Sequence, residues 1–309
     1  MLIDESMPKE ETSLPDYEPP VTETAPWRFR LALIQRQIEL FSRYLKFHWR
    51  VTGPAPVAPQ GFKFYGNRHV IKGVFEPEET KIFQHLLPHV DGMVNVGANV
   101  GYYCCLALQA GRPVIAFEPV DLNVRHLLAN VWVNGWADRF EVLPVCLGNR
   151  TGVIPLYGGG TGASLLRGWA NSPDSHANLA PIHTADVLLK DRLSGTRQLF
   201  MVDIEGAEAF FLEGAQALLD AQPQHLWILE ISIDQHRAGG INPELKNIFN
   251  QFWSRGYQAW ALDASLQAIE PARIDTIMTT QVNDLQVCNF LFLPDSESTP
   301  MIEALRSLL

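Results

Sequence analysis

The segment at residues 94–103 constrains the fold more than any other part of the chain. Its sequence, VNVGANVGYY, begins as a short buried strand, continues as a glycine-containing turn and ends as the start of a helix. Glycine permits backbone angles and close approaches that other residues do not tolerate. In an open parallel sheet, ligands bind beyond the carboxyl ends of the strands. The segment therefore predicts an α/β fold that binds a nucleotide-like cofactor at residues 97–101.

Strand-like and helix-like segments alternate through the rest of the chain. Because helix-like segments separate successive strand candidates, we predict a doubly wound, mostly parallel sheet with helices on both faces. Residues 148–181, rich in Gly, Ser and Asn, predict a hairpin or a loop over the sheet. The strand candidates are residues 93–96, 113–119, 140–145, 198–205, 225–232, 257–263 and 287–293.

The chain outside this domain is predicted to have a different character at each end. Its first segment is acidic and proline-rich, and such a composition cannot bury enough apolar surface to become ordered. We divide the chain into a disordered tail (1–26), an N-terminal region with an amphipathic helix, a short hairpin at 62–74 and a lead-in helix (27–90), the cofactor-binding domain (91–295) and a C-terminal helix (296–309).

Residues 27–50 have the pattern of a basic amphipathic helix. Ile34, Ile38 and Leu45 recur at helical spacing, and basic side chains such as Arg43 lie on the opposite face. One interpretation is a helix that lies on a membrane or binds a partner chain. The other, which we favour, is a helix that docks its apolar stripe on its own domain and leaves its basic face in water.

Charge and hydropathy exclude several classes of protein. The formal net charge is −10 and the pI is about 5.4, which argues against a nucleic-acid partner, since phosphate binding needs a concentrated basic surface. There is no run of 18 apolar residues and no basic-then-apolar leader at the N-terminus. The four cysteines show no paired spacing and are expected to be reduced. These features predict a cytoplasmic protein.

The glycine spacing distinguishes between two cofactor classes. A dinucleotide site requires G-x-G-x-x-G, whereas the turn here has Gly97, Asn99 and Gly101 at alternate positions, as in methyltransferases that bind S-adenosylmethionine. A second strand candidate ends at Glu118, about 20 residues after the turn, where a carboxylate can accept hydrogen bonds from ribose hydroxyls. A dehydrogenase is therefore disfavoured.

Four motifs in order, NVGANVGYY, FEPVDLN, NVWVNGW and MVDIEGAE, together resemble the FkbM family of methyltransferases over residues 62–294. The resemblance implies a class I, Rossmann-like fold and S-adenosylmethionine as cofactor. It also implies methyl transfer to a hydroxyl, and we expect the acceptor to be a small molecule, a glycan or a lipid-linked substrate. The cofactor-binding residues that we infer are Asn95, Gly97, Ala98, Asn99, Gly101, Tyr102, Glu118, Pro119 and Asn123.

Two residues depart from the pattern of that family. Asn95 stands where the family typically has aspartate, and Met201 stands where it has lysine. An amide oxygen can still accept a hydrogen bond from the cofactor's ammonium group. The loss of an ion pair is expected to weaken cofactor binding by on the order of 1–2 kcal/mol.

Acidic residues after two strand candidates are the predicted catalytic groups. Asp203 and Glu205 match the family motif, and Glu230 ends the next strand candidate. Clustered carboxylates raise one another's pKa and suit a general base or an Mg²⁺ site, although the resemblance implies no metal requirement. Glu208 is interpreted as a partner of a helix dipole. His183 and His236 are weaker candidates for a base.

Other functions remain alternatives at this point. A binding or scaffold protein on a degenerate methyltransferase domain would explain Asn95 and Met201, whereas the intact Glu118 and Asp203 speak against it. A nucleic-acid methyltransferase is disfavoured by the acidic charge. The residues do not identify the acceptor, and they leave homo-oligomerisation open.

Overall fold

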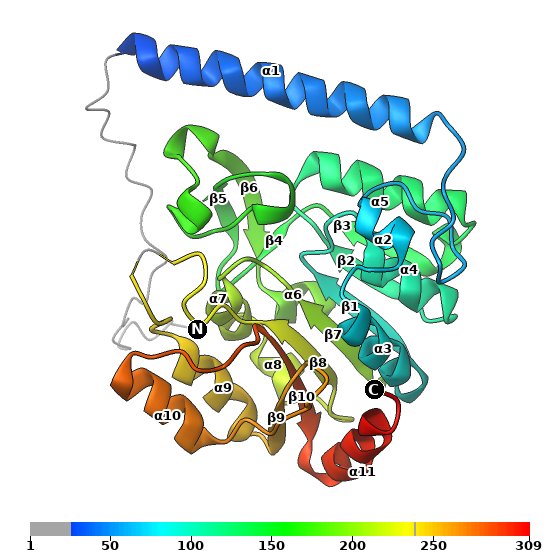
Figure 1. Ribbon diagram of the computed structural model, residues 1–309, viewed down its shortest axis with the longest axis vertical. Coiled ribbons are helices and arrows are strands. Elements are labelled where there is room, and N and C mark those ends of the chain that lie inside the picture. Colours follow the sequence, from blue (N-terminus) through cyan, green and yellow to red (C-terminus); the bar gives the residue numbers. More distant parts are fainter. Residues whose placement is uncertain (1–25, 238) are drawn as a thin grey trace, which may run out of the picture.

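A seven-stranded sheet forms the centre of the computed structural model, which describes residues 26–237 and 239–309 (Figure 1). The strand order is β3-β2-β1-β7-β8-β10-β9, and β10 alone runs in the direction opposite to the other six strands. All of the predicted strands are present. They are β1 (Gly92–Val96), β2 (Val114–Phe117), β3 (Phe140–Leu143), β7 (Gln198–Val202), β8 (Leu226–Glu230), β9 (Tyr257–Ala261) and β10 (Asn289–Pro294).

The strand order reverses between β1 and β7. From β1 the chain adds β2 and β3 on one side, and it then crosses back to place β7 on the other side of β1. Ligands of doubly wound folds bind at such a switch point, beyond the carboxyl ends of the strands. The glycine turn follows β1 and Asp203 follows β7, so both lie at this point.

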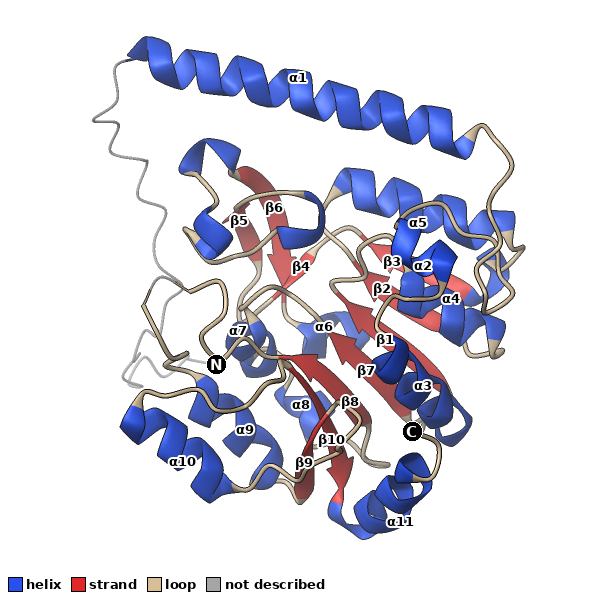
Figure 2. Ribbon diagram, in the orientation of Figure 1, coloured by secondary structure: helices blue, strands red, loops and turns tan. Residues whose placement is uncertain are grey.

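Helices cover both faces of the sheet (Figure 2), which is why every residue of β1 and β7 is buried. On one face pack α3 (Pro77–Leu86), α4 (Tyr102–Gln109), α5 (Asp121–Val133) and α11 (Asp295–Arg306). On the other face pack α6 (Ala185–Leu189), α7 (Glu208–Glu213), α8 (Gln216–Leu219), α9 (Leu245–Trp253) and α10 (Pro271–Thr280). Short 3-10 helices are η1 (Leu87–His89), η2 (Ala137–Arg139), η3 (Gly160–Gly162), η4 (Trp169–Asn171) and η5 (Asp174–His176).

A small second sheet stands beside the carboxyl ends of the main strands. It consists of β4 (Cys146–Leu147), β5 (Gly152–Leu156) and β6 (Asn178–His183) in the order β4-β6-β5. Strands β5 and β6 are antiparallel, so the hairpin alternative for residues 148–181 is confirmed. The long connection between them carries residues 158–162, which border the glycine-turn site.

The predicted hairpin at residues 62–74 is wrong. Residues there form α2 (Arg68–Lys72), and pairing is limited to an isolated bridge between Val57 and Lys63. The side chain of Asn67 accepts a hydrogen bond from the backbone N–H of His69 and caps the helix, and Gly73 ends it at a φ of 72°. The sequence pair Gly66-Asn67 is therefore part of a helix start and not of a hairpin turn.

The predicted amphipathic helix is present as α1 (Pro26–Val51), but its orientation differs from the expectation. Ile34, Ile38 and Leu45, the expected buried stripe, are 55%, 63% and 42% exposed. The opposite face packs on the rest of the described protein, which we call the body. There, Arg36 donates hydrogen bonds to the carbonyl oxygens of His176 and Ala177. No helix in the described part of the chain is long and apolar enough to cross a membrane. The predicted tail, except for Pro26, lies outside the described residues.

Candidate active site

The turn after β1 is held in place by two close backbone approaches. Gly97 has a φ of 82°, and a Cβ there would lie 1.8 Å from the backbone oxygen of Asp203. Gly101 has a φ of 88°, and a Cβ there would lie 2.2 Å from Leu127 Cδ1. A side chain at Gly97 would collide with fixed backbone, and one at Gly101 would displace Leu127 and strain the backbone, so the glycines let the turn pack against both the β7 end and α5.

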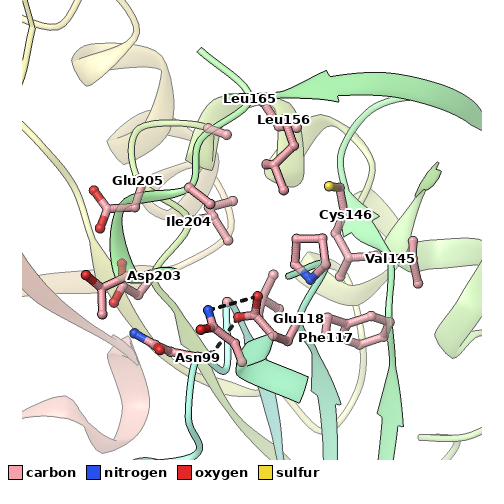
Figure 3. A pocket seen from close by; sticks show the side chains of 18 of the residues that line it. Asn99, Phe117, Glu118, Val145, Cys146, Leu156, Leu165, Asp203, Ile204 and Glu205 are labelled. Atoms are coloured by element: carbon pink, nitrogen blue, oxygen red, sulfur yellow. Dashed lines mark hydrogen bonds between the residues drawn. The ribbon is translucent and has the colours of Figure 1, made fainter. Parts of the chain in front are cut away.

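Glu118 lies at the centre of a crevice between β2 and the turn (Figure 3). Its carboxylate accepts hydrogen bonds from the backbone N–H groups of Asn99 (2.7 Å) and Val120 (2.8 Å) and from Asn123 Nδ2 (3.3 Å). The side chain is buried, and this burial outweighs the hydrogen bonds and raises the pKa of Glu118 to about 7. Three donors leave capacity on the two oxygens for a ligand hydroxyl.

One wall of the Glu118 crevice is apolar. Figure 3 shows Val145, Cys146, Leu156 and Leu165 around it, while Asp203 and Glu205 lie on the opposite side. The space enclosed is only about 50 Å³. Residues 158–162 restrict it, because Asn123 Nδ2 also donates to the carbonyl oxygen of Gly160 at 2.9 Å.

A larger cavity of about 650 Å³ adjoins the crevice and shares Gly97, Asn99 and Asp203 with it. Four carboxylates line this second cavity, and they come from the segment before α3, from the loop after β7 and from β8: Glu76, Asp203, Glu205 and Glu230. We call it the carboxylate cavity. Arg68 is the one lysine or arginine among the described residues that line it.

The carboxylates of this cavity disfavour one another's ionisation. Burial raises the pKa of Asp203 well above its ordinary range, and the charges of Glu230 and Glu205 add to the effect. Burial, with a smaller contribution from Glu205, raises the pKa of Glu230 to about 7. Both shifts favour the protonated forms of Asp203 and Glu230, and a pKa of about 7 divides Glu230 between its two forms at neutral pH.

Glu205 is fixed by its surroundings. Its backbone has a φ of 56°, its Oε2 accepts a hydrogen bond from Trp169 Nε1 at 2.8 Å, and its carbonyl oxygen accepts one from Ser164 Oγ at 2.7 Å. At the next position, a Cβ on Gly206 would lie 2.4 Å from the Trp169 ring. The glycine of the D-x-E-G sequence therefore has a steric cause, since the indole occupies the space beside Gly206.

The structure brings all the predicted site residues together around the two cavities. Glu118, Pro119 and Asn123 line the crevice; Asn95, Ala98, Gly101, Tyr102 and Glu230 line the carboxylate cavity; Gly97, Asn99, Asp203 and Glu205 line both.

The weaker candidates lie elsewhere. His183 contacts Thr151 at the end of β6, His236 contacts the Trp169 ring, and neither lines the crevice or the carboxylate cavity. Glu208 accepts a hydrogen bond from the Gly206 N–H at the start of α7, in agreement with its predicted role at a helix start. In the part of the chain that the structure describes, no three His, Cys, Asp or Glu side chains are arranged to hold a metal ion.

Sequence reasoning missed Glu76. It precedes α3 with a φ of 42°, and its Oε2 accepts a hydrogen bond from Tyr103 Oη at 2.5 Å. Tyr103 and Asn289 also line the carboxylate cavity without having been predicted. The position of Glu76 just before Pro77 marks a helix start in the sequence, but only the fold places it opposite β7.

Comparisons with solved structures give low similarity. An FkbM methyltransferase from Methylobacillus flagellatus KT has 18% identity and a TM-score of 0.42, with 66% of this chain and 44% of that chain covered. An O-methyltransferase from Bacillus cereus, solved in complex with SAH, has 11% identity and a TM-score of 0.41, with 70% and 79% covered. The chain thus spans less than half the length of the former. No curated protein matches.

A family profile gives the assignment. The profile described as the Methyltransferase FkbM domain matches residues 95–259, which is more than half of the chain and includes the turn, Glu118 and the carboxylates after β7 and β8. The mostly parallel sheet with its switch point between β1 and β7 is the class I, Rossmann-like arrangement. The chain therefore belongs to the FkbM family of S-adenosylmethionine-dependent methyltransferases.

Proposed function

We propose that the protein methylates a hydroxyl oxygen of a small molecule, glycan or lipid-linked acceptor, which binds in the carboxylate cavity. The observation that carries the proposal is the position of Asp203 and Glu230 in a cavity that shares Gly97 and Asn99 with the Glu118 crevice. A hydroxyl bound there would lie between Glu230, whose carboxylate can take its proton, and the proposed cofactor site.

The described residues fit S-adenosylmethionine. Glu118 has acceptor capacity for ribose hydroxyls, and the apolar wall beyond it suits an adenine ring. Asn95 is 3% exposed and lines the carboxylate cavity, and among the described residues its amide oxygen accepts no hydrogen bond. That oxygen is therefore available to an ammonium group. When bound, the cofactor supplies an electrophilic methyl group on a sulfonium.

Glu230 is the proposed general base. A base has to be ionised and yet attract a proton, and a pKa of about 7 meets both requirements near neutral pH. Burial and the neighbouring carboxylates raise the pKa of Asp203, and its protonated form is proposed to donate a hydrogen bond that orients the acceptor oxygen. Because carboxylates predominate in the cavity, neutral acceptors should be preferred over phosphorylated or carboxylated ones.

A non-catalytic scaffold is the second candidate, and it rests on Asn95 and Met201. Calorimetric titration with S-adenosylmethionine and S-adenosylhomocysteine separates the two proposals. Micromolar binding would support the methyltransferase, whereas no binding at millimolar ligand would favour the scaffold. A subsequent screen should pair each neutral hydroxylated acceptor with its phosphorylated counterpart, and faster transfer to the phosphorylated member would contradict the proposed acceptor class.

Glu230→Gln tests the base. With the first acceptor found, kcat/KM of the wild type should rise with pH and level off above about 7, since Glu230 must lose its proton to act. In Glu230→Gln we expect a loss of about 10²- to 10⁴-fold and no such rise. Glu303→Gln, on the exposed side of α11, is the matched control. An unchanged pH profile in Glu230→Gln would assign the base to another residue.

A further inference from the structure

The side of α1 that faces away from the body is apolar over most of its length. Figure 1 shows α1 along one edge of the molecule, with the other described elements all on one side of it. The outward residues recur every three or four positions and form one stripe of a helix. We define this outer face as Leu31, Ile34, Ile38, Phe41, Leu45 and Trp49, which are between 42% and 78% exposed. Phe41 lies at its edge, because it also lines the space between α1 and the rest of the protein.

The inner side of α1 is already engaged by the chain itself. Arg36 hydrogen-bonds to the η5 segment, the Phe47 ring lies 4.3 Å from the His126 ring, and Arg125 stacks on Tyr44 at 5.6 Å. These contacts fix the inner side of α1 toward α5 and η5. The outer face therefore cannot turn inward without the loss of these contacts.

The charge of α1 is opposite to that of the protein. The helix contains six Lys or Arg residues and one Glu, although the whole chain has a net charge of −10. Arg30 and Lys46 are exposed and flank the outer face on its two sides. An apolar stripe with basic flanks on a helix too polar to span a bilayer is the combination that binds in the interface of an anionic membrane.

Pairing with a second copy of the helix fits the sequence less well. If the outer face were the seam of a coiled coil, the flanking positions would include Arg30, Gln35, Gln37, Ser42 and Tyr44, of which only Arg30 is charged and none is acidic. Interhelical ion pairs are therefore missing at these positions. Two strongly basic helices would also repel each other.

We propose that the outer face of α1 docks the protein on an anionic lipid bilayer, with the helix axis parallel to the membrane plane. Leu31 to Trp49 span about 27 Å of helix, all of which can lie at the headgroup boundary. Between α1 and the body lies a space of about 740 Å³ that shares Pro119, Leu156 and Gly160 with the Glu118 crevice. Docking places this space next to the lipid. The proposal does not depend on the acceptor being a hydroxyl compound.

Vesicle co-sedimentation of the full chain tests the proposal. We expect binding to phosphatidylcholine vesicles that contain phosphatidylglycerol, at least about tenfold stronger than binding to phosphatidylcholine alone, and weaker binding as salt is raised. The variant Ile34→Gln/Ile38→Gln/Leu45→Gln should lose at least about tenfold in affinity for the anionic vesicles. Equal binding by this variant would overturn the proposal, as would no binding by the wild type.

Matched variants distinguish vesicle binding through the outer face of α1 from nonspecific hydrophobic adsorption. Val74→Gln/Val153→Gln/Val187→Gln removes three exposed apolar side chains that are scattered over the body and should bind like the wild type. Arg30→Gln/Lys46→Gln leaves the outer face intact and should reduce only the preference for anionic lipid. Light scattering measures mass in parallel, and a wild-type dimer that the Ile34/Ile38/Leu45 variant breaks, without vesicle binding, would identify a self-association surface instead. Unchanged binding of S-adenosylhomocysteine verifies that each variant is folded.

Discussion

Asn95 and Met201, the two departures from the family pattern, are neighbours in the sheet. They are paired in the register of β1 and β7, and both line the carboxylate cavity. Residues paired across adjacent strands point to the same face and contact each other. In the sequence these two changes lie more than 100 positions apart. In the structure they form one pair, in which neutral side chains stand where the family typically has aspartate and lysine.

A double-mutant cycle tests this coupling. Asn95→Asp alone should lower the free energy of unfolding by about 1–3 kcal/mol, because it buries a carboxylate beside Met201 and near Asp203. Addition of Met201→Lys should restore most of that loss through an ion pair. Urea denaturation of the wild type, both single variants and the double variant gives the coupling energy. Additive effects would mean that the two side chains do not interact.

The positions of site residues were predictable where a sequence motif marked them and not where the fold alone brings them to the site. Glu118 and Asp203 follow strands that the sequence shows plainly, and both line the cavities at the switch point. Glu76 reaches the same place from a segment before α3 that has no motif. The upward pKa shifts of Asp203 and Glu230 depend on burial and on neighbouring carboxylates, which only the fold brings together.

Elements buried on both sides were predicted most accurately. The central strands β1 and β7 are buried at every residue, because helices cover both faces of the sheet. The error at α2 came from the pair Gly66-Asn67, because asparagine caps helices as readily as it forms turns. For α1 the periodicity gave the helix, but both its sides carry apolar residues, and only tertiary contacts show which side faces the body.

Residues 158–162 are expected to act as a lid over the crevice. A space of about 50 Å³ cannot hold an adenosine, since ligand pockets for molecules of that size measure hundreds of Å³. Gly160 has a φ of 67°, so Gly160→Ala should destabilise the closed loop by about 1 kcal/mol. If opening precedes binding, the association rate of S-adenosylhomocysteine should rise about fivefold in stopped-flow measurements.

The control for the lid is Gly195→Ala. Gly195 has a φ of 71° in a loop remote from the crevice, and a Cβ there would contact nothing within 4 Å. It thus introduces comparable backbone strain without a change at the site. Equal association rates in the wild type and in both variants would show that residues 158–162 do not limit entry.

At the scale of the whole molecule, buried carboxyls make stability depend on pH. Burial raises the pKa of Glu118, Glu208 and Glu230 to about 7 in the folded state. The folded state therefore binds more protons than the unfolded state between about pH 4.5 and 7, and these groups lower stability as pH rises through that window. His225, whose pKa burial lowers to about 4, acts in the opposite direction below about pH 6.5.

Urea denaturation between pH 6 and 8 measures the net effect. We expect the free energy of unfolding of the ligand-free protein to be lower at pH 8 than at pH 6.5, by up to about 1–3 kcal/mol. Glu208→Gln, outside both cavities, should reduce this decrease because it removes one of the three groups. A decrease of the same size in that variant would show that Glu208 titrates normally in the folded protein.

The close approach of Gly97 to the backbone of Asp203 separates two parts of the site. The spacing of the turn and the loop after β7 is fixed by the main chain, whereas the cavity walls can change with their side chains. Main-chain contact between the cofactor turn and the loop after β7 fixes their separation, whatever side chains surround them. The segments that wall the cavities, before α3 and between β5 and β6, lie outside this contact. Mutation and selection can therefore rebuild the acceptor pocket while the reacting geometry is inherited unchanged, and a single scaffold can evolve toward many acceptors.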